Sequence, residues 1–458
     1  MLRGVEVGML RSLKLWIALT VLAGCTDENP VTPLPDAPPA DAPPDATPTC
    51  APVTGSGIVH DSNLDAPETW TEAASPHVVM FDTTVSARIT IEPCATIRIA
   101  GGRTVTFATG GSFVATGTAN QPVTFEPLVA GAPWAALRVL TGELSLTHSV
   151  VRGGGDPLGG PLTLAGAIVM ARSPAATTGA LHLADVEIEG SASQGVYLPS
   201  AVGFDATSQN LRVHGSASAP IHTYARVLGS IPPGTYTGNG LDRLIISGSG
   251  GQVIDNQTMH ARGIPYRVGT APNEQLDVVA TAGVALLTIE PGVTIEFQPG
   301  GRFRIEPSFT TSPAKAALRA VGTAAQPIVL TSLAAAPAAG DWIGLSFGGA
   351  VDVQSVLEHV HVMYAGGATA TGSNSCPYPG RTGQNDAAIR IFGDAPPPGQ
   401  FITSSQIIAS ARDGIDRGWR SDSMPDFLPT NTFTSVTGCR QTLPRTTAGV
   451  CPTTPPCP

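Results

Sequence analysis

Three phrases occur twice in this sequence, in the same order, and they constrain the fold more than any other feature. The first copy, within residues 90–139, reads TIEPCATIRIAGG, GTANQPVTFEP and PWAALRV. The second, within residues 288–347, reads TIEPGVTIEFQPGG, GTAAQPIVLTS and DWIGLSF. Apolar residues that alternate within each phrase predict short strands, and the Pro-Gly and Gly-Gly pairs predict turns between them. A long duplication built of strands and turns is typical of a repeat architecture.

A shorter repeat runs inside each copy. The stretches VEIEGSASQGV (186–196), LRVHGSASAPI (211–221) and SQIIASARDGI (405–415) share one pattern, and the first two begin about 25 residues apart. Coils of this length, whose strands end in Gly, Ser or Asn, resemble the parallel β-helix. The predicted fold is therefore all-β, a single-stranded right-handed parallel β-helix over residues 56–435. A sandwich or a propeller is the alternative, but propeller blades repeat every 40 residues or so.

The wording PGVTI, GTA-x-QPI, DW-x-GL and L-x-HV-x-V-x-YAGG resembles right-handed parallel β-helix repeat lipoproteins of the myxobacteria-like type, with a pectate-lyase-like superfamily fold. The resemblance implies an architecture and no particular activity. Two long repeats, about 56–237 and 238–435, are expected, followed by a Cys/Pro-rich tail over 436–458.

The amino-terminal stretch predicts export and a lipid anchor. Arg11 and Lys14 precede a short apolar run over residues 15–21, which is too short to span a bilayer and is typical of a signal peptide. The tetrad LAGC, ending at Cys25, resembles a bacterial lipobox, which implies cleavage after residue 24 and acylation of Cys25. An ordinary signal peptide with a chance cysteine is the alternative. Residues 25–55, rich in Pro and Asp, predict a disordered tether. The expected location is the outer membrane or cell surface.

Composition narrows the possible partners. The formal charge of −10 argues against nucleic acid, because phosphate binding needs clustered Lys and Arg. The 52 Gly and 42 Pro favour strands and turns over helices. No paired C-x-x-C with nearby His is present, so neither a metal site nor another cofactor is predicted.

Six cysteines follow the lipobox, namely Cys50, Cys94, Cys376, Cys439, Cys451 and Cys457. An even number in an exported protein predicts disulfides, with fifteen possible connectivities. Chain position favours Cys50 with Cys94, because Cys94 replaces the turn residue Gly292 of the second copy. The remaining four are expected to pair as Cys376–Cys439 and Cys451–Cys457.

The densest group of chemically active side chains lies near the carboxyl end, in RDGIDRGWR. The candidate catalytic residues are Asp386, Arg412, Asp413, Asp416 and Arg417, with Asn385 beside them. Many parallel β-helix proteins cleave acidic polysaccharides with clustered Asp and an Arg base, and paired carboxylates also serve in glycoside hydrolysis. Alternation would place Asp413 and Asp416 on different faces of a strand, and Gly414 is expected to mark a turn. A turn with ion pairs is the alternative interpretation.

Aromatic residues and histidines were weighed as ligand contacts. Tyr364 and Trp419 are the candidate ligand-binding residues. Trp134 and Trp342 could stack on sugars, but they belong to a repeated phrase, so packing is the preferred interpretation. His148 and His359 occupy equivalent repeat positions and are expected to be packing or turn residues.

Two functions compete. The favoured one is a non-enzymatic, lipid-anchored envelope protein with a structural or adhesive role that binds polysaccharide or another surface component. The rival is a polysaccharide lyase or glycoside hydrolase on the same scaffold, which should bring three or more acidic residues and an Arg or Lys into one groove. A purely structural envelope protein is a third hypothesis.

Overall fold

The structure is a computed structural model in which the chain divides into two compact units, Met1–Asp45 and Ala46–Pro458. It describes residues 49–156, 166–170, 179–247, 251–280, 282–306, 315–370, 372, 375–378, 386–393, 395–452 and 457, all in the second unit. The predicted signal peptide, Cys25 and the tether up to residue 48 lie outside the described residues. So does Asn385.

Almost all regular structure in the described chain is strand, and every strand pair is parallel. An 11-stranded sheet, here called the first-copy sheet, contains β1 (Ile58–His60), β2 (Glu68–Trp70), β3 (His77–Val79), β5 (Arg88–Ile91), β6 (Thr96–Ile99), β8 (Ser112–Thr116), β9 (Val123–Pro127), β11 (Glu143–Arg152), β13 (Ala180–Glu189), β15 (Leu211–His214) and β17 (Gly234–Thr235). Two 3₁₀ helices, η1 (Glu72–Ala74) and η2 (Ala225–Ser230), complete this half.

A 13-stranded sheet, here called the long sheet, runs through both copies. It contains β4 (Thr83–Val85), β7 (Thr104–Phe107), β10 (Ala136–Val139), β12 (Gly166–Met170), β14 (Gln194–Leu198), β16 (Ile221–Tyr224), β18 (Leu244–Ser247), β20 (Tyr266–Val268), β23 (Thr294–Phe297), β26 (Ile328–Ser332), β29 (Val360–Met363), β32 (Gln406–Ile408) and β34 (Thr432–Thr434).

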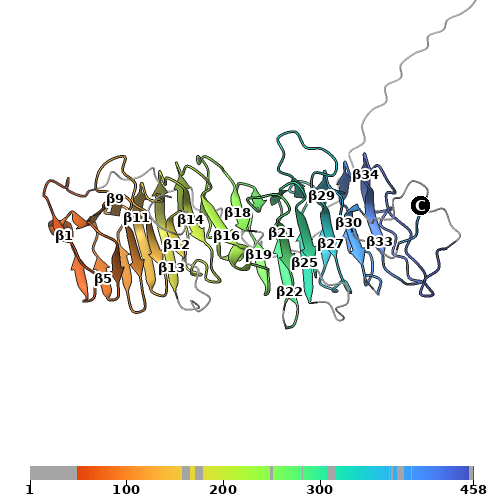
Figure 1. The fold of residues 1–458 in the computed structure, drawn as a ribbon, viewed down its shortest axis with the longest axis horizontal. Helices are drawn as coiled ribbons and strands as arrows, with labels where there is room; N and C mark the ends of the chain where they lie inside the picture. Colours follow the sequence, from red (N-terminus) through yellow and green to blue (C-terminus); the bar gives the residue numbers. More distant parts are fainter. Residues whose placement is uncertain are drawn as a thin grey trace, which may run out of the picture. The chain divides into compact units, whose positions relative to one another are not determined.

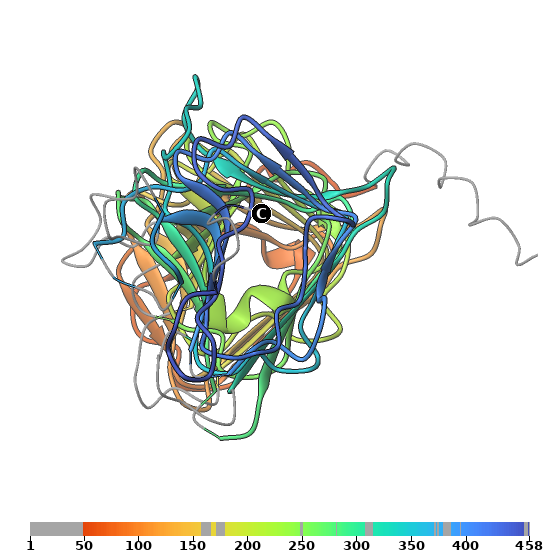
Figure 2. The same cartoon turned by 90° about the vertical axis from the view of Figure 1, so that its right-hand side faces the viewer.

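Two five-stranded sheets belong to the second copy alone. One contains β19 (Gln257–Met259), β22 (Ala285–Ile289), β25 (Ala316–Val321), β28 (Val356–Glu358) and β31 (Ile402–Thr403). The other contains β21 (Gln275–Val278), β24 (Arg302–Ile305), β27 (Gly344–Phe347), β30 (Ala387–Phe392) and β33 (Asp413–Gly418). Successive coils follow one another in chain order (Figure 1), and the view along the coils shows their strands stacked as walls (Figure 2). The chain is therefore a parallel β-helix, as the sequence predicts.

The register of the long sheet explains the apolar alternation of the repeated phrases. It aligns one inward side chain of each coil, and these form a column of fully buried residues: Val105, Leu137, Ile168, Val196, Ile221 and Leu244. Because parallel strands lie about 4.8 Å apart, each of these side chains packs on the next. One continuous core results, and each coil needs the same alternation to join it.

A left-handed backbone conformation marks one corner of the coils. His148 (φ 42°) and His359 (φ 50°) both adopt it, which confirms their assignment as turn residues. Cys94 (φ 63°) and Gly292 (φ 80°) share it at the equivalent corner of an earlier coil. This conformation is costly for most side chains and free for glycine. The corner therefore explains why a glycine stands in one copy where a cysteine stands in the other.

The two copies are out of phase by one wall of the helix. In the first copy, β3, β6 and β9 belong to the first-copy sheet, while β4, β7 and β10 belong to the long sheet. In the second copy, the strands equivalent in sequence to β3, β6 and β9 are β20, β23 and β26, and these belong to the long sheet. The first-copy sheet therefore ends at β17, and the two five-stranded sheets begin with β19 and β21. The change of sheets falls next to the repeat boundary that the sequence places at 237/238.

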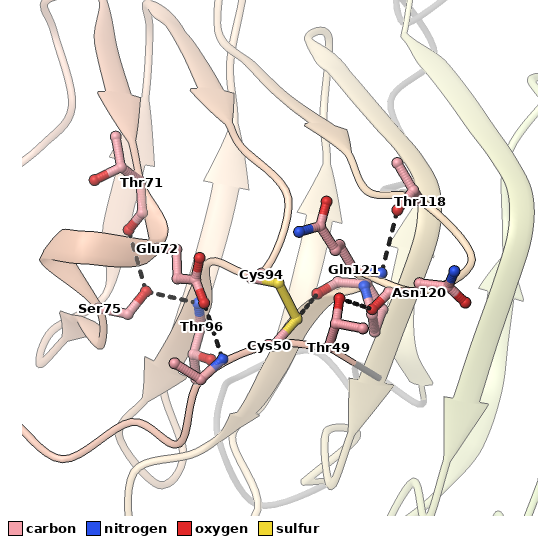
Figure 3. The surroundings of a disulfide bond; sticks show 12 residues. Thr49, Cys50, Thr71, Glu72, Ser75, Cys94, Thr96, Thr118, Asn120 and Gln121 are labelled. Atoms are coloured by element: carbon pink, nitrogen blue, oxygen red, sulfur yellow. Dashed lines mark hydrogen bonds between the residues drawn. A yellow bond between two sulfur atoms is a disulfide. The ribbon is translucent and has the colours of Figure 1, made fainter. Parts of the chain in front are cut away.

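The amino-terminal segment 49–57, here called the strap, is fastened to the body of the helix. The Thr49 amide donates to Asn120 O at 2.8 Å, and the Ala51 amide donates to the Glu72 carboxylate at 3.0 Å. Between them Cys50 is bonded to Cys94, which confirms that predicted disulfide (Figure 3). Residues 49–55, assigned to the tether from sequence, are thus partly held by the β-helix.

The carboxyl-terminal disulfides differ from the expectation. Their pairs are Cys376–Cys451 and Cys439–Cys457, so the predicted pairs Cys376–Cys439 and Cys451–Cys457 are wrong. The tail forms one more turn beside the last coil, where Gln441 pairs with Ile415 and Arg445 with Arg420 in parallel bridges. Parallel pairing therefore continues past residue 435, where the sequence placed the end of the helix. This path carries the tail past Cys376, whose amide donates to Leu443 O at 2.7 Å.

A polar groove between the two copies as candidate functional site

A hollow lies where the two out-of-phase copies meet, and residues of η2 and β19 line it. Strand β19 is near the middle of the ribbon (Figure 1). The volume of the hollow is about 520 Å³. The first copy contributes Ala201, Arg226, Val227, Gly229 and Ser230 to its walls, and the second copy contributes Asp255, Asn256, Gln257, Thr258 and His260. Most of these side chains are polar, so the hollow suits a hydrated, hydrogen-bonding ligand better than an apolar one.

The wall from the first copy is built on η2, a kinked 3₁₀ turn. Val227 departs from helical geometry (φ −124°, ψ 15°), and both Val227 and Leu228 are buried. Burial of these two anchors the turn in the core and leaves Arg226 exposed at the hollow. At Gly229 a Cβ would lie 2.8 Å from the Gln257 Oε1 and 3.1 Å from the Thr258 amide. Glycine at this position therefore permits the close contact of the two copies.

Four consecutive polar residues, from Asp255 to Thr258, line the second-copy wall. The Gln257 side chain accepts a hydrogen bond from the Gly229 amide at 3.1 Å and donates to Asp255 at 2.8 Å. The Asn256 oxygen accepts from the Leu286 amide at 3.1 Å. Asp255 and Asn256 are nevertheless exposed. Their side chains are thus held in place by the protein while still facing water, as a preorganised binding surface requires.

His260 sits at the end of the hollow in a fixed orientation. Its Nδ1 lies 2.7 Å from the Glu290 Oε1, and its backbone oxygen accepts from the Tyr266 hydroxyl at 2.7 Å. The other oxygen of Glu290 accepts from the Ala261 amide at 2.8 Å. Burial alone would raise the pKa of Glu290, but the bonds from Ala261 and His260 outweigh it and leave the pKa below its usual range. Glu290 therefore stays ionised and orients the imidazole.

A second hollow of about 360 Å³ lies in the second copy, and its lining begins at Ala261, next in sequence to His260. Its lining includes Arg262, Tyr266, Pro291 and Gln326. Arg262 crosses back to the first copy, where its Nε and Nη2 donate to Ile231 O at 3.1 and 2.7 Å. This pair of bonds closes the junction beside the groove.

The groove differs from the arrangement that the lyase or hydrolase hypothesis requires. Only Asp255 contributes a carboxylate to the lining of the larger hollow, whereas the hypothesis expects at least three acidic residues beside an Arg or Lys. In the described part of the chain, no group of three or more His, Cys, Asp or Glu is placed to hold a metal ion. The residues present instead mix donors and acceptors with little net charge.

Four of the five predicted catalytic residues at the last coils are buried. Asp386 and Asp413 lie on adjacent strands, where the Asp413 amide donates to Asp386 O at 3.1 Å, and the two residues are 3% and 2% exposed. The Asp386 carboxylate accepts from the Thr369 amide and hydroxyl at 2.7 and 2.8 Å. The Asp413 carboxylate accepts from the Cys439 amide at 2.9 Å and from the Tyr378 hydroxyl. We therefore assign the Asp413 carboxylate to fastening the tail and the Asp386 carboxylate to fastening the segment at Thr369.

Asp416 and Arg417 are buried as well, on opposite faces of β33. Asp416 accepts from the Thr442 hydroxyl at 3.1 Å. Arg417 donates to Thr442 O at 2.6 Å and to Pro425 O at 2.9 Å, and burial lowers its pKa to about 10. Arg412, the fifth candidate, is exposed.

Gly414 lies inside β33, not in the turn expected from the sequence. A Cβ there would lie 2.4 Å from Arg440 O, so the glycine allows the tail to pack closely. Because Asp413 and Asp416 share one strand three positions apart, their side chains point to opposite faces. A single catalytic pair is thus not formed.

The tryptophans are part of the core in this fold. Trp419 is fully buried and donates to Ser423 O at 3.2 Å, so it offers no face to a ligand. Trp134 and Trp342 are also fully buried, and their indoles donate to equivalent carbonyls at 2.9 and 2.8 Å. Packing, the preferred interpretation of these two, is confirmed. Tyr364 is half-buried at a corner with φ 62°.

The sequence analysis did not single out the groove residues. Those of the second copy lie in DNQTMHAR, near its start, where the first copy reads APETWTEA. A divergence between copies at a repeat boundary is the signal that could have found them. It could not have shown that Arg226 faces them, because that contact depends on the phase shift.

The fold defines a parallel β-helix protein, with a polar hollow at the junction of its two copies. Residues 275–386 match a family model described as a pectate-lyase like beta helix domain, which begins just after the groove. This part of the chain is similar to that family. Neither the curated proteins nor the solved structures gave a match to the chain. No helix among the described residues is long and apolar enough to cross a membrane.

Proposed function

We propose that this protein is a lipid-anchored β-helix of the cell envelope that binds a neutral polysaccharide in the groove between its two copies. The observation that carries the proposal is the preorganised polar surface of Arg226, Asp255, Asn256 and His260. Sugar hydroxyls both donate and accept hydrogen bonds, which matches an Arg, a carboxylate and an amide side by side. A polyanionic glycan fits less well, because the chain carries a formal charge of −10.

Binding to a glycan array, followed by calorimetry with the best ligand, tests this proposal on the exported mature chain. The variant R226A/D255A removes two groove groups that face solvent and should weaken binding by about tenfold or more. R319A is the matched control, because Arg319 is an exposed arginine of β25 away from the groove. No binding to any glycan, or equal loss in both variants, contradicts the proposal.

The anchor has its own test. Metabolic labelling with radioactive palmitate should mark the wild-type chain and not C25S, and only the wild type should fractionate with membranes. An unlabelled wild-type chain would leave the groove proposal intact and refute the anchor.

One observation favours an enzymatic alternative. His260, oriented by Glu290, borders the same hollow as Arg226, and an oriented imidazole can act as a general base. Incubation with uronate and neutral glycans, monitored for unsaturated products and new reducing ends, tests this alternative. Turnover by the wild type that is lost in H260A would replace the binding proposal.

A further inference from the structure

The strap runs along the β-helix in the direction opposite to the succession of the coils. Thr49, the first described residue, lies at the turn of Asn120 before β9, and its amide and hydroxyl both bond to Asn120 O at 2.8 and 3.2 Å. The chain then passes Cys94, and next Glu72, before it forms β1 (Figure 3). The strap thus runs across three coils toward the end of the helix. Thr49, where the described chain begins, therefore lies at the side of the third coil.

Without a covalent link, tension on the chain before residue 49 would peel the first coil. The strap is held by a few hydrogen bonds, which a pull from residue 48 would load one after another. Beyond it, β1 pairs with β3 alone and β2 with β5 alone, because both are edge strands. Edge strands loaded from their outer end can open one pair at a time, and such local opening costs little free energy.

The disulfide changes the path of the load. Cys50 and Cys94 have Cα atoms 5.3 Å apart, and Cys94 is 4% exposed at the corner between β5 and β6. Both strands are internal, because β5 pairs with β2 and β8, and β6 pairs with β3 and β9. Force on Cys50 therefore enters the helix at an internal corner, and the segment 51–93 carries none of it.

We propose that the Cys50–Cys94 disulfide is a mechanical bypass that keeps the first coil of the β-helix folded when the tether is pulled. The proposal rests on the anchored tether proposed above, since an anchor is what loads the chain. It does not depend on glycan binding. Under tension, the first coil then stays folded as long as the disulfide is oxidised, whichever part of the β-helix carries the opposing force.

Single-molecule pulling between an amino-terminal handle before residue 46 and a carboxyl-terminal handle tests the bypass. The variant C50S/C94G opens the link and places at 94 the glycine that the second copy has at the equivalent corner. It should show an early, low-force extension that the oxidised wild type lacks. Because 44 residues separate the two cysteines, total contour length should grow by about 150 Å.

The control C439S/C457S opens a disulfide at the other end, and it should add no early step at the amino-terminal coil. Reduction of the wild type should reproduce the early low-force step of C50S/C94G, which separates the missing link from a folding defect of the variant. An early low-force step in the oxidised wild type would overturn the bypass. So would a variant that resists to the same force as the wild type. Glycan binding measured on the same proteins reports separately on the groove, and palmitate labelling on the anchor.

Discussion

His222 makes the stability of the long sheet depend on pH. It lies in β16 between Tyr197 and Ile245 of the neighbouring strands, is 8% exposed, and its Nε2 lies 2.8 Å from the Ser247 hydroxyl. Burial, helped by the positive charge of Arg267, lowers the pKa of His222 to about 4. Protonation in the folded state would place a positive charge in a buried position near Arg267, so the folded protein keeps the imidazole neutral.

The sign and size of the effect follow from linkage. An unfolded histidine has a pKa of about 6.5, so between that value and about 4 the unfolded chain binds a proton that the folded chain does not. Stability is therefore full above about pH 6.5 and falls as the pH decreases through this window. From about pH 7.5 to about pH 4.5, His222 alone should lower the free energy of unfolding by about 2–3 kcal/mol.

Urea unfolding followed by tryptophan fluorescence at the two pH values measures this loss. H222Q removes the titration and keeps a side chain that can bond to Ser247, so it should lose about 2–3 kcal/mol less than the wild type. Carboxylates and the remaining histidines contribute equally to both proteins and cancel in the difference. If H222Q and the wild type lose the same free energy, His222 does not have the lowered pKa on which the reasoning depends.

Two substitutions test the packing. W342A removes a fully buried indole that stacks on Phe297 and should cost about 3–5 kcal/mol, whereas V353A, at a residue 76% exposed, should stay within about 0.5 kcal/mol in the same urea assay. G154A places a Cβ 2.7 Å from the Trp134 ring and should cost about 1–3 kcal/mol by thermal and urea unfolding, while G399A, with no atom within 4 Å, should be close to neutral. Equal effects within either pair would show that the core tolerates these changes and that the packing argument is wrong.

Stacking made the fold predictable. Each coil must present alternate apolar residues to the same core, so β6 and β23 carry TIRI and TIEF at equivalent places. The corner between coils needs a left-handed residue, so the Gly292 of one copy identified the corner at Cys94 of the other. These constraints are local and repeat along the chain, and a repeated local constraint leaves a visible pattern in the sequence.

The carboxyl-terminal disulfides were not predictable by the same means. Distance along the chain favoured Cys451 with Cys457, but the tail forms one more turn beside the last coil, and this path brings Cys451 to Cys376. The contacts that fix this path are made once, by buried groups such as Asp413 on the Cys439 amide. Those same carboxylates looked catalytic in the sequence, because charge density alone does not distinguish an open site from a buried fastening.

The groove marks a deeper limit of sequence reasoning about repeats. Matching phrases identify equivalent strands, but equivalence does not say which wall of the helix each strand joins, because every wall has the same apolar alternation. Here the strands of the second copy lie one wall away from their first-copy equivalents. As a result, the first-copy sheet ends at β17, close to where the two five-stranded sheets begin. Arg226 from the first copy and His260 from the second line the same hollow only because of this displacement. Neither copy alone could form this surface, so a duplication that kept the copies in phase would have lengthened the β-helix without creating the hollow in which we propose that a glycan binds.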